Sequence, residues 1–516
     1  MPELNYISVG FQPGPPLPNH PLLLQLNTRI ILTERSQGLG RSATLDDITD
    51  ADLDGYARQG FRCIWLLGLW QTGERGRLIS RTHPGIREEC ARDLPDLRDG
   101  DICGSPFAIR QYHAHADFGG DAALARLRRR MADRDIKLIA DFVVNHVAPD
   151  HPWLESHPEW FIIGTEQDIA AAPGNWIRLP TGEFQRESIV AHGRDPYFPG
   201  WADTVQLNLR HPGCREAMVG ELERIASQCD GVRCDMAMLA QADVILQTWG
   251  DRSLPADGSL SAGTSFWPEA IRRIKAARAD FLFIAEVYWD REGQLQEEGF
   301  DFTYDKRLYD RLRRGEGLAA REHLQAGPAF QDRSLRFLEN HDEPRAAAAF
   351  PADMHRAAAL ITFFVPGMRF FHEGQLDGRQ ARVSMHLQRR PLERANKEWK
   401  DFYGYLLEVL QRTEFDEGHW TLLPPLPGWE GNPTSAQFVA FAWNHLGLPG
   451  LLGVVNFGPT QGQCHVRLVS AGFEHESIRL KDIFSDAYFV RKTKDVAGPG
   501  MFFDLPPWGF HLLEIL

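Results

Sequence analysis

The stretch CDGVRCDMAML, residues 229–239, places two charged residues inside an otherwise apolar run. In a β-strand, alternate side chains point to the same face, so Arg233 and Asp235 would lie side by side. Charges on the inner face of a buried strand are costly unless they are paired or used in chemistry. A structural ion pair at a strand end is one interpretation, and a cation that keeps a reactive carboxylate ionised is the other.

Other polar residues follow apolar runs in the same way. Each run is typical of a short strand, and the polar residues stand at or just past the strand ends: Asp141 and His146 in IKLIADFVVNH, Glu286 in FLFIAE, and His341 and Asp342 in SLRFLENHDE. One carboxylate at a strand end is ordinary. Four carboxylates, with two histidines and an arginine at the same level, favour a catalytic site over coincidental ion pairs.

The segments that must position these residues alternate regularly. Apolar runs that predict strands are separated by helical patterns, and they cover residues 28–34, 61–70, 136–146, 231–235, 281–286, 301–305, 334–343 and 367–374. About eight helix–strand units predict a parallel sheet closed into a (β/α)8 TIM barrel. Barrel enzymes collect their chemistry at the carboxyl ends of the strands, where the polar residues stand.

Two segments depart from this alternation. Residues 147–200, rich in proline, glycine and aromatic residues, follow the third strand and predict an inserted domain. From residue 418, short strands separated by turn residues predict a C-terminal all-β sandwich domain. The predicted organisation is therefore an α/β catalytic barrel over 1–146 and 201–417, an inserted domain over 147–200, and a β-sandwich over 418–516.

Composition narrows the class of partners and the compartment. The chain has 516 residues, of which 43% are hydrophobic, and a net charge of −14 without a basic block, which argues against nucleic acid and anionic membranes as partners. No apolar run reaches membrane-spanning length, and the first residues do not resemble a secretory signal. The seven cysteines are scattered, so we expect free thiols and a cytoplasmic protein. The oligomeric state stays open.

Several stretches carry a family resemblance. DFVVNH, GVRCDMAML, EVYW and FLENHDE resemble, in the usual order, the four conserved regions of the α-amylase family, glycoside hydrolase family 13. DTVQLN (203–208) resembles a fifth region, and GSPFAIRQYHAHADFG resembles the segment before the third strand. The resemblance spans the chain and implies a retaining α-glycoside hydrolase or transglycosylase. Its partner would be a small-molecule α-glucoside, either a malto-oligosaccharide or a disaccharide, processed through a covalent glycosyl–Asp intermediate.

The resemblance also implies residue roles. Asp235 matches the nucleophile, Glu286 the general acid/base, and Asp342 the carboxylate that binds sugar hydroxyls and steadies the transition state. Arg233 would hold Asp235 ionised and separate its pKa from that of Glu286. A further set matches positions that bind or support the sugar in subsite −1: Asp141 (acting through Arg233), His146, Arg233, His341 and the stacking ring Phe107. For Phe107, ordinary core packing is the alternative.

Departures from the family pattern concern metal and specificity. Met238 and Leu239 stand where many amylases carry a lysine and a histidine, and that histidine lends its carbonyl to a calcium site. Asn145 matches one family ligand, but calcium needs six to eight oxygens. A structural calcium ion is therefore possible but not favoured, and we expect no metal site and no cofactor. Gly104 stands where exo-acting relatives often carry an aspartate, so pocket and cleft both stay open.

Two alternative functions stay open. An α-glucosyl isomerase or maltosyltransferase, such as a trehalose-forming enzyme, would use the same catalytic residues. A catalytically silent, carbohydrate-binding family member is the other alternative, and the intact set of three carboxylates argues against it.

Overall fold

The computed structural model describes residues 16–255, 264–445, 448–468 and 476–516. Its centre is a closed barrel of eight parallel strands: β1 (Leu22–Asn27), β2 (Phe61–Leu67), β5 (Lys137–Val143), β10 (Gly231–Asp235), β11 (Leu282–Ala285), β12 (Phe302–Tyr304), β13 (Ser334–Arg336) and β14 (Met368–His372). Around the barrel the order is β1–β14–β13–β12–β11–β10–β5–β2. The predicted (β/α)8 barrel is therefore confirmed.

One barrel strand differs from the sequence analysis. The first strand is β1, and the run 28–34 belongs to helix α1 (Thr28–Leu39) instead. The side chain of Asn27 accepts a hydrogen bond from the backbone N–H of Ile30 and so caps this helix. The β-branched residues of TRIILTE suggested a strand, but the cap in front of them starts a helix.

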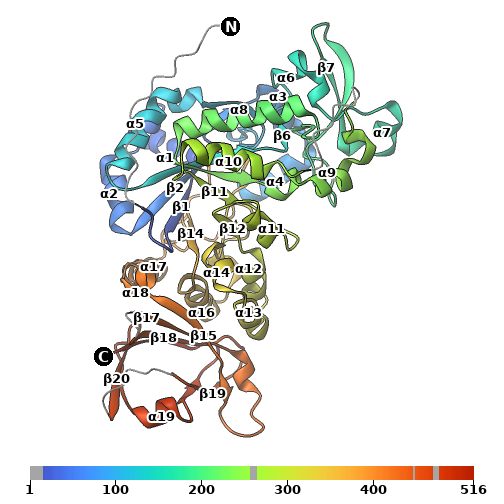
Figure 1. Ribbon diagram of the computed structural model, residues 1–516. Coiled ribbons are helices and arrows are strands. Elements are labelled where there is room, and N and C mark those ends of the chain that lie inside the picture. Colours follow the sequence, from blue (N-terminus) through green and yellow to red (C-terminus); the bar gives the residue numbers. More distant parts are fainter. Residues whose placement is uncertain (1–15, 256–263, 446–447, 469–475) are drawn as a thin grey trace.

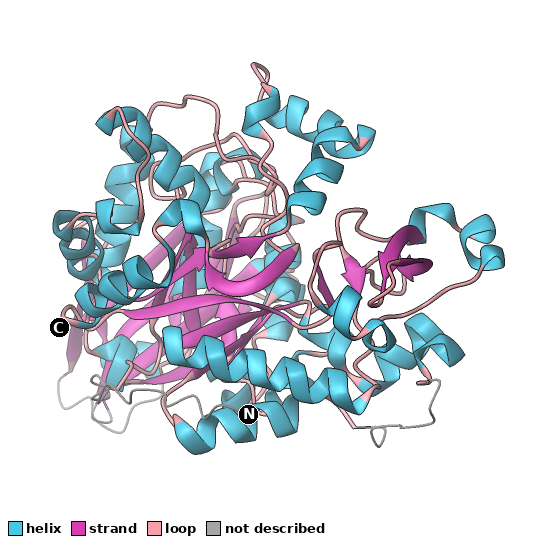
Figure 2. Ribbon diagram, turned by 90° about the horizontal axis from the view of Figure 1, so that it is seen from above, coloured by secondary structure: helices cyan, strands magenta, loops and turns pink. Residues whose placement is uncertain are grey.

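Helices surround the strands, as Figure 2 shows from above. The main ones are α2 (Asp50–Arg58), α5 (Gly120–Ala132), α8 (Pro212–Gln228), α10 (Trp267–Ala277), α12 (Lys306–Arg313), α16 (Ala352–Phe363) and α17 (Lys397–Val409). In α5, the buried residues recur at helical spacing, and the arginines Arg126 and Arg130 on its outer side pair with Asp46 and Asp50. This arginine-dense run is therefore a helix whose arginines are engaged in ion pairs.

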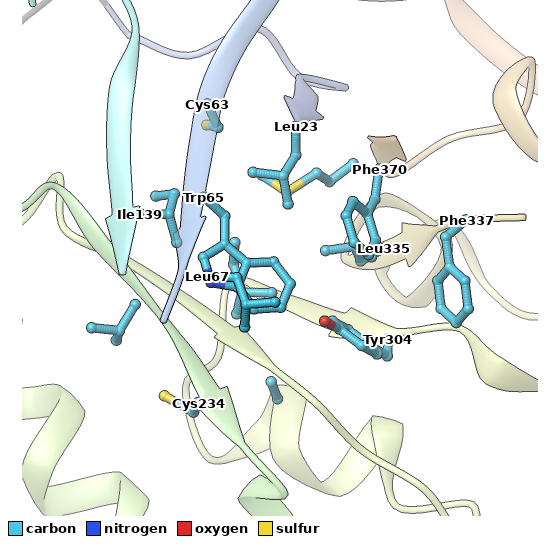
Figure 3. Packing of buried hydrophobic residues seen from close by; sticks show 14 of the residues in the cluster. Leu23, Cys63, Trp65, Leu67, Ile139, Cys234, Tyr304, Leu335, Phe337 and Phe370 are labelled. Carbon is cyan, nitrogen blue, oxygen red and sulfur yellow. The ribbon is translucent and has the colours of Figure 1, made fainter. Parts of the chain in front are cut away.

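The barrel interior is a packed core. Leu23, Trp65, Leu335 and Phe370 point inward from four different strands and are buried (Figure 3). Tyr304 completes this group from β12 and is also buried. Trp65 and Tyr304 lie near the carboxyl ends of their strands. The apolar core therefore borders the polar residues at the strand ends.

The inserted segment leaves and rejoins the barrel through two short strands. The segment begins at β6 (His146–Val147), which pairs antiparallel with β9 (Val205–Gln206) at the other end of the segment. Between them lie α6 (Trp153–Ser156), α7 (Glu166–Ala171) and the hairpin of β7 (Trp176–Thr181) and β8 (Arg186–Ala191).

The C-terminal part consists of two antiparallel sheets. The larger has the order β15–β17–β18–β23–β20–β21, from His419–Leu423, Phe438–His445, Leu448–Asn456, Phe510–Ile515, Ser477–Asp482 and Tyr488–Lys492; the smaller has the order β16–β19–β22, from Leu426–Pro427, Gly462–Val466 and Met501–Leu505. Their facing residues share one hydrophobic cluster, as the predicted sandwich requires. The indole N–H of Trp443 donates to the carbonyl of Phe364 at 2.8 Å, which joins these sheets to the barrel.

The inserted segment and the C-terminal sheets lie at opposite ends of the molecule (Figure 1). Because the inserted segment begins directly after the carboxyl end of β5, it lies at the carboxyl ends of the barrel strands. Within the described ranges, no helix combines the length and apolarity that crossing a bilayer requires. All seven cysteines are unpaired, as their scattered positions predict.

Candidate active site

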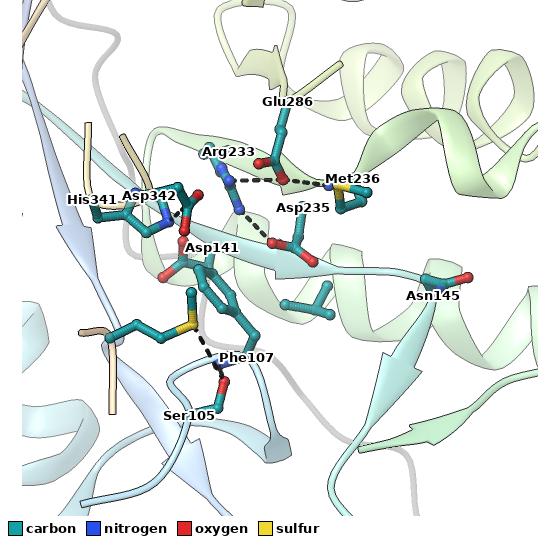
Figure 4. A network of polar contacts seen from close by, with 12 residues as sticks. Ser105, Phe107, Asp141, Asn145, Arg233, Asp235, Met236, Glu286, His341 and Asp342 are labelled. Carbon is teal, nitrogen blue, oxygen red and sulfur yellow. Dashed lines mark hydrogen bonds and ion pairs between the residues drawn. The ribbon is translucent and has the colours of Figure 1, made fainter. Parts of the chain in front are cut away.

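Arg233 lies between two carboxylates at the carboxyl ends of β10 and β11. Its Nη1 is 2.6 Å from Oδ1 of Asp235, and its Nη2 is 2.8 Å from Oε2 of Glu286. All three side chains are buried. Figure 4 shows the guanidinium between the two acids. Strand alternation predicts the pair of Arg233 and Asp235 within β10. In the structure, this pair is joined by Glu286 from the end of the neighbouring strand β11.

Aromatic rings surround the same guanidinium. Its central carbon lies 5.0 Å from the ring centroid of Trp65, 5.4 Å from that of Phe107 and 5.7 Å from that of Tyr304. Arg233 Nε–H also donates to the hydroxyl of Tyr304 at 3.4 Å. Cation–π contacts of this kind are favourable when water is excluded. Phe107 therefore lies at the site, in contact with its central cation.

The backbone turns sharply after each of the two acids. Met236 has φ 42° and ψ 51°, the left-handed region that costs a non-glycine residue energy, and its N–H donates to Oε2 of Glu286 at 2.7 Å. Trp289 and Asp290 both have φ 62°. Between them and the acid, Tyr288 donates its hydroxyl to Oε1 of Glu286 at 2.9 Å. Both oxygens of Glu286 are thus held by named donors.

Asp141 supports this group through Trp65. Its Oδ1 accepts from the indole N–H of Trp65 at 2.9 Å, and its Oδ2 accepts from the backbone N–H of Gly68 at 2.8 Å. The ring of Trp65 also lies against the guanidinium, so Trp65 is in contact with both Asp141 and Arg233. Burial raises the pKa of Asp141 to about 7, although the nearby Arg233 lowers it.

The third carboxylate comes from the segment after β13. Nε2 of His341 is 3.1 Å from Oδ2 of Asp342, and Nδ1 of His341 is 2.8 Å from the amide nitrogen of Gln25. Burial, together with Arg233, lowers the pKa of His341 to about 3, so the imidazole is neutral at pH 7. The ring of Phe107 lies 5.7 Å from that of His341. The side chain of Asp342 is 32% exposed, which makes it the most open of the three carboxylates.

His146 stands at the border of the inserted segment. Its ring lies 5.1 Å from the ring of Trp201, and its Nδ1 is 3.5 Å from the side-chain nitrogen of Asn145. Burial lowers the pKa of His146 to about 4, so this imidazole is also neutral. His146 thus lies against Trp201 of the inserted segment, whereas His341 lies beside Asp342.

Burial and Arg233 act in opposite directions on the pKa of both central acids. Burial raises the pKa of Glu286 to about 7, Arg233 opposes this shift, and the nearby Asp235 adds to it. Burial also raises the pKa of Asp235, against which Arg233 acts by charge and hydrogen bond. Arg233 lies beside Asp235, as the sequence predicts, and its guanidinium contacts Glu286 in addition.

Some residues of the site escaped the sequence analysis. Trp65 and Tyr304 were assigned only to strands, and Tyr288 and Met236 only to conserved stretches. For Tyr288, its spacing from Glu286 was a usable signal. In an extended chain, side chains two residues apart point to the same side, so Tyr288 would lie on the side of Glu286. For Met236, the left-handed backbone that directs its N–H toward Glu286 has no signature in its residue type.

Comparisons with known proteins bear on the family and the fold of this chain. Residues 107–400 match the family model described as "Alpha amylase, catalytic domain". Alpha-amylase 3 of Dictyoglomus thermophilum is 24% identical over 291 residues, which cover 51% of this chain and 52% of that protein. An alpha-1,4-glucan:maltose-1-phosphate maltosyltransferase of Rhodospirillum rubrum is 23% identical over 257 residues, or 48% of this chain and 29% of that protein. The chain therefore matches about half the length of the first relative and less than a third of the second.

The fold comparison extends over nearly the whole chain. The crystal structure of a noncanonic maltogenic alpha-amylase, AmyB from Thermotoga neapolitana, superposes with a TM-score of 0.67 at 18% sequence identity, covering 96% of this chain and 99% of that one. This likeness supports the barrel and the C-terminal sheets. The family model spans more than half of the 516 residues, including all four strand-end carboxylates, and this protein therefore belongs to the α-amylase family.

Proposed function

We propose that this protein cleaves α-glucosidic bonds with retention of configuration, through a glycosyl intermediate on Asp235. The observation that carries the proposal is the single guanidinium of Arg233 in contact with both Asp235 and Glu286. Because one cation contacts both carboxyl groups, the two lie close enough to act on one sugar ring. Retaining enzymes need this closeness, whereas inverting enzymes leave room for a water molecule between the acids.

The chemistry follows from the two environments. Glu286, with a pKa raised to about 7, would give its proton to the glycosidic oxygen as that bond breaks. Asp235, ionised beside Arg233, would attack the anomeric carbon and form the ester. Glu286, now ionised and held by Tyr288 and Met236, would then take a proton from the attacking hydroxyl, and the bond to Asp235 would break.

The remaining residues suit a bound sugar. Asp342 is partly exposed and lies beside the neutral His341, so this pair can accept and donate hydrogen bonds to neighbouring hydroxyls. The ring of Phe107 lies next to both His341 and Arg233, where it can pack against a pyranose face. Malto-oligosaccharides or a glucose disaccharide fit this set, and relatives named alpha-amylases support that substrate class.

A second candidate function is transfer of the sugar to another sugar. Tyr197, in the inserted segment, is 60% exposed, and its ring lies 5.0 Å from that of Trp289, three residues after the proposed acid. The leaving group departs on the side of the acid, and the acceptor arrives there. This aromatic pair, in which Tyr197 is exposed and Trp289 is half-buried, can pack against an acceptor sugar. Relatives named maltosyltransferases support this alternative.

One experiment tests both candidates. The purified protein is incubated with maltose, trehalose, sucrose and maltoheptaose, with proton NMR for the first anomer formed and chromatography for the products. We expect the α-anomer first, and a β-anomer formed first would contradict the proposal. If transfer occurs, Tyr197→Ala should lower the ratio of transfer to hydrolysis. Phe198→Ala, at the neighbouring residue that is 66% exposed, is the matched control.

A further inference from the structure

An amide side chain closes the junction between the barrel and the inserted segment. Gln206 is only 2% exposed, and its Nε2 lies 2.8 Å from Oδ1 of Asn145, 2.9 Å from the carbonyl oxygen of Asn145 and 3.0 Å from the carbonyl oxygen of Leu207. Its Oε1 accepts from the side-chain nitrogen of Asn145 at 3.1 Å and from the backbone N–H of Arg194 at 3.4 Å. Every polar atom of this amide is thus engaged.

The geometry around Nε2 is unusual for an amide. Three oxygens converge on a nitrogen that carries only two hydrogens, so at least one hydrogen is shared between acceptors. Oxygens converging on one point are what a bound cation requires. Asn145 is also the residue that, by family resemblance, would ligate calcium at this junction.

The residues present do not fit a calcium ion. The side-chain oxygen of Asn145 is directed at an N–H donor, which would repel a cation at that position. Across the ranges that the structure describes, no group of three or more His, Cys, Asp or Glu side chains could hold a metal ion.

We propose that Gln206 stands in place of a cation here, and that its amide ties the inserted segment to the barrel without metal. A neutral amide with all its hydrogen bonds made can replace an ion, because burying it carries no charge-desolvation cost. Its backbone also pairs directly with that of His146 in the β6–β9 ladder.

The amide of Gln206 also positions His146 for substrate. This second role depends on the proposed function. Gly193 packs so closely behind His146 that an added Cβ would lie 2.6 Å from the Cβ of the histidine. The imidazole of His146 also contacts the ring of Trp201. With its neighbours packed this tightly, a shift of β9 would move the imidazole. Gln206 is therefore a positioning residue, acting through His146.

Thermal unfolding of the full chain tests the metal replacement. We expect the wild-type Tm to be the same in EDTA and in millimolar calcium chloride. Gln206→Glu places a carboxylate among the converging oxygens, so its Tm should fall in EDTA and recover in calcium chloride. The matched control is Gln296→Glu, because Gln296 is also buried and donates to Thr303 Oγ1 and two carbonyls. This control should lose Tm without a response to calcium.

Three results would overturn the proposal. They are a wild-type Tm that falls in EDTA and returns with calcium, a Gln206→Glu variant that calcium does not stabilise, and a Gln296→Glu control that calcium stabilises equally. None of these depends on catalysis, so they are distinct from a failure of the proposed function.

Kinetics test the positioning role on the same variants. Below the Tm, Gln206→Glu in EDTA should raise KM for maltoheptaose by roughly tenfold with a smaller change in kcat, because the binding residue His146 is displaced. Calcium chloride should restore KM. An unchanged KM, or a loss of kcat alone, would show that Gln206 does not position His146.

Discussion

Strand β10 is flanked by two buried aspartates that both contact arginine, and the two sites are built differently. Just before the strand, Oδ1 of Asp230 accepts from Arg128 at 2.6 and 3.1 Å and from Arg278 at 3.3 Å, while Oδ2 accepts from the backbone N–H of Leu138 at 3.0 Å. At its carboxyl end, Asp235 has one arginine, and that arginine is shared with Glu286.

The difference separates a structural ion pair from a reactive one. At Asp230, two arginines and a backbone N–H all donate to one carboxylate. This carboxylate therefore links the segments that carry Arg128, Arg278 and Leu138. Near Asp235, one cation serves two acids, so burial raises the pKa of both. A buried charge with few partners is costly, and active sites retain such costs because reactivity depends on them.

Replacing each aspartate by asparagine should give the largest effects and opposite outcomes. Asp235→Asn should lower kcat by on the order of 10³-fold or more, because the covalent route is lost, with little change in Tm. Asp230→Asn should destabilise the fold by about 3 kcal/mol, because two arginines lose their shared carboxylate, while kcat of the folded protein is kept. Steady-state kinetics and thermal unfolding of both variants measure this contrast.

The comparison fails if the two variants behave alike. Near-normal turnover by Asp235→Asn would remove the nucleophile from Asp235. A normal Tm for Asp230→Asn would show that its ion pairs contribute nothing to stability.

A second kinetic effect should separate the two acids that share Arg233. Glu286→Gln should lower turnover of maltose by roughly 10²–10⁴-fold, because the leaving oxygen no longer receives a proton. An α-glucosyl fluoride needs no such proton, so its first step should be far less affected. The glycosyl–Asp235 adduct should then accumulate and appear in the mass spectrum of the quenched protein. Equal losses on both substrates would contradict the role of Glu286.

The sequence allowed the barrel and the positions of its acids to be predicted, because strand ends and family stretches coincide. It did not allow the start of the barrel to be placed, since the choice between strand and helix over 28–34 depends on one cap at Asn27. Nor did it reveal that Arg233 contacts Glu286, because that contact depends on the pairing of β10 with β11. Partners within one strand can be read from alternation, whereas partners across strands require the fold.

The same limit applies at the inserted segment. The resemblance drew attention to Asn145 and Leu239, but the residue whose side-chain amide contacts Asn145 is Gln206, 61 residues further along the chain. Its contacts with Asn145 follow from the antiparallel pairing of β6 and β9. A pairing between two-residue strands has no periodicity that a sequence could display.

The smallest predicted effect concerns how Tyr288 adjusts the shared acid. Its hydroxyl donates to Oε1 of Glu286, and a donor of this kind stabilises the ionised carboxylate and lowers its pKa. Glu286 must be protonated for the first step, so kcat/KM should fall as pH rises through about 7. Tyr288→Phe removes the donor, the pKa of Glu286 should rise, and this limb should move to higher pH by up to about one unit. Tyr304→Phe is the control, because the hydroxyl of Tyr304 accepts from Arg233 instead. A limb that moves to lower pH in Tyr288→Phe, or that moves equally in both variants, would show that the tyrosine beside Glu286 does not set its protonation.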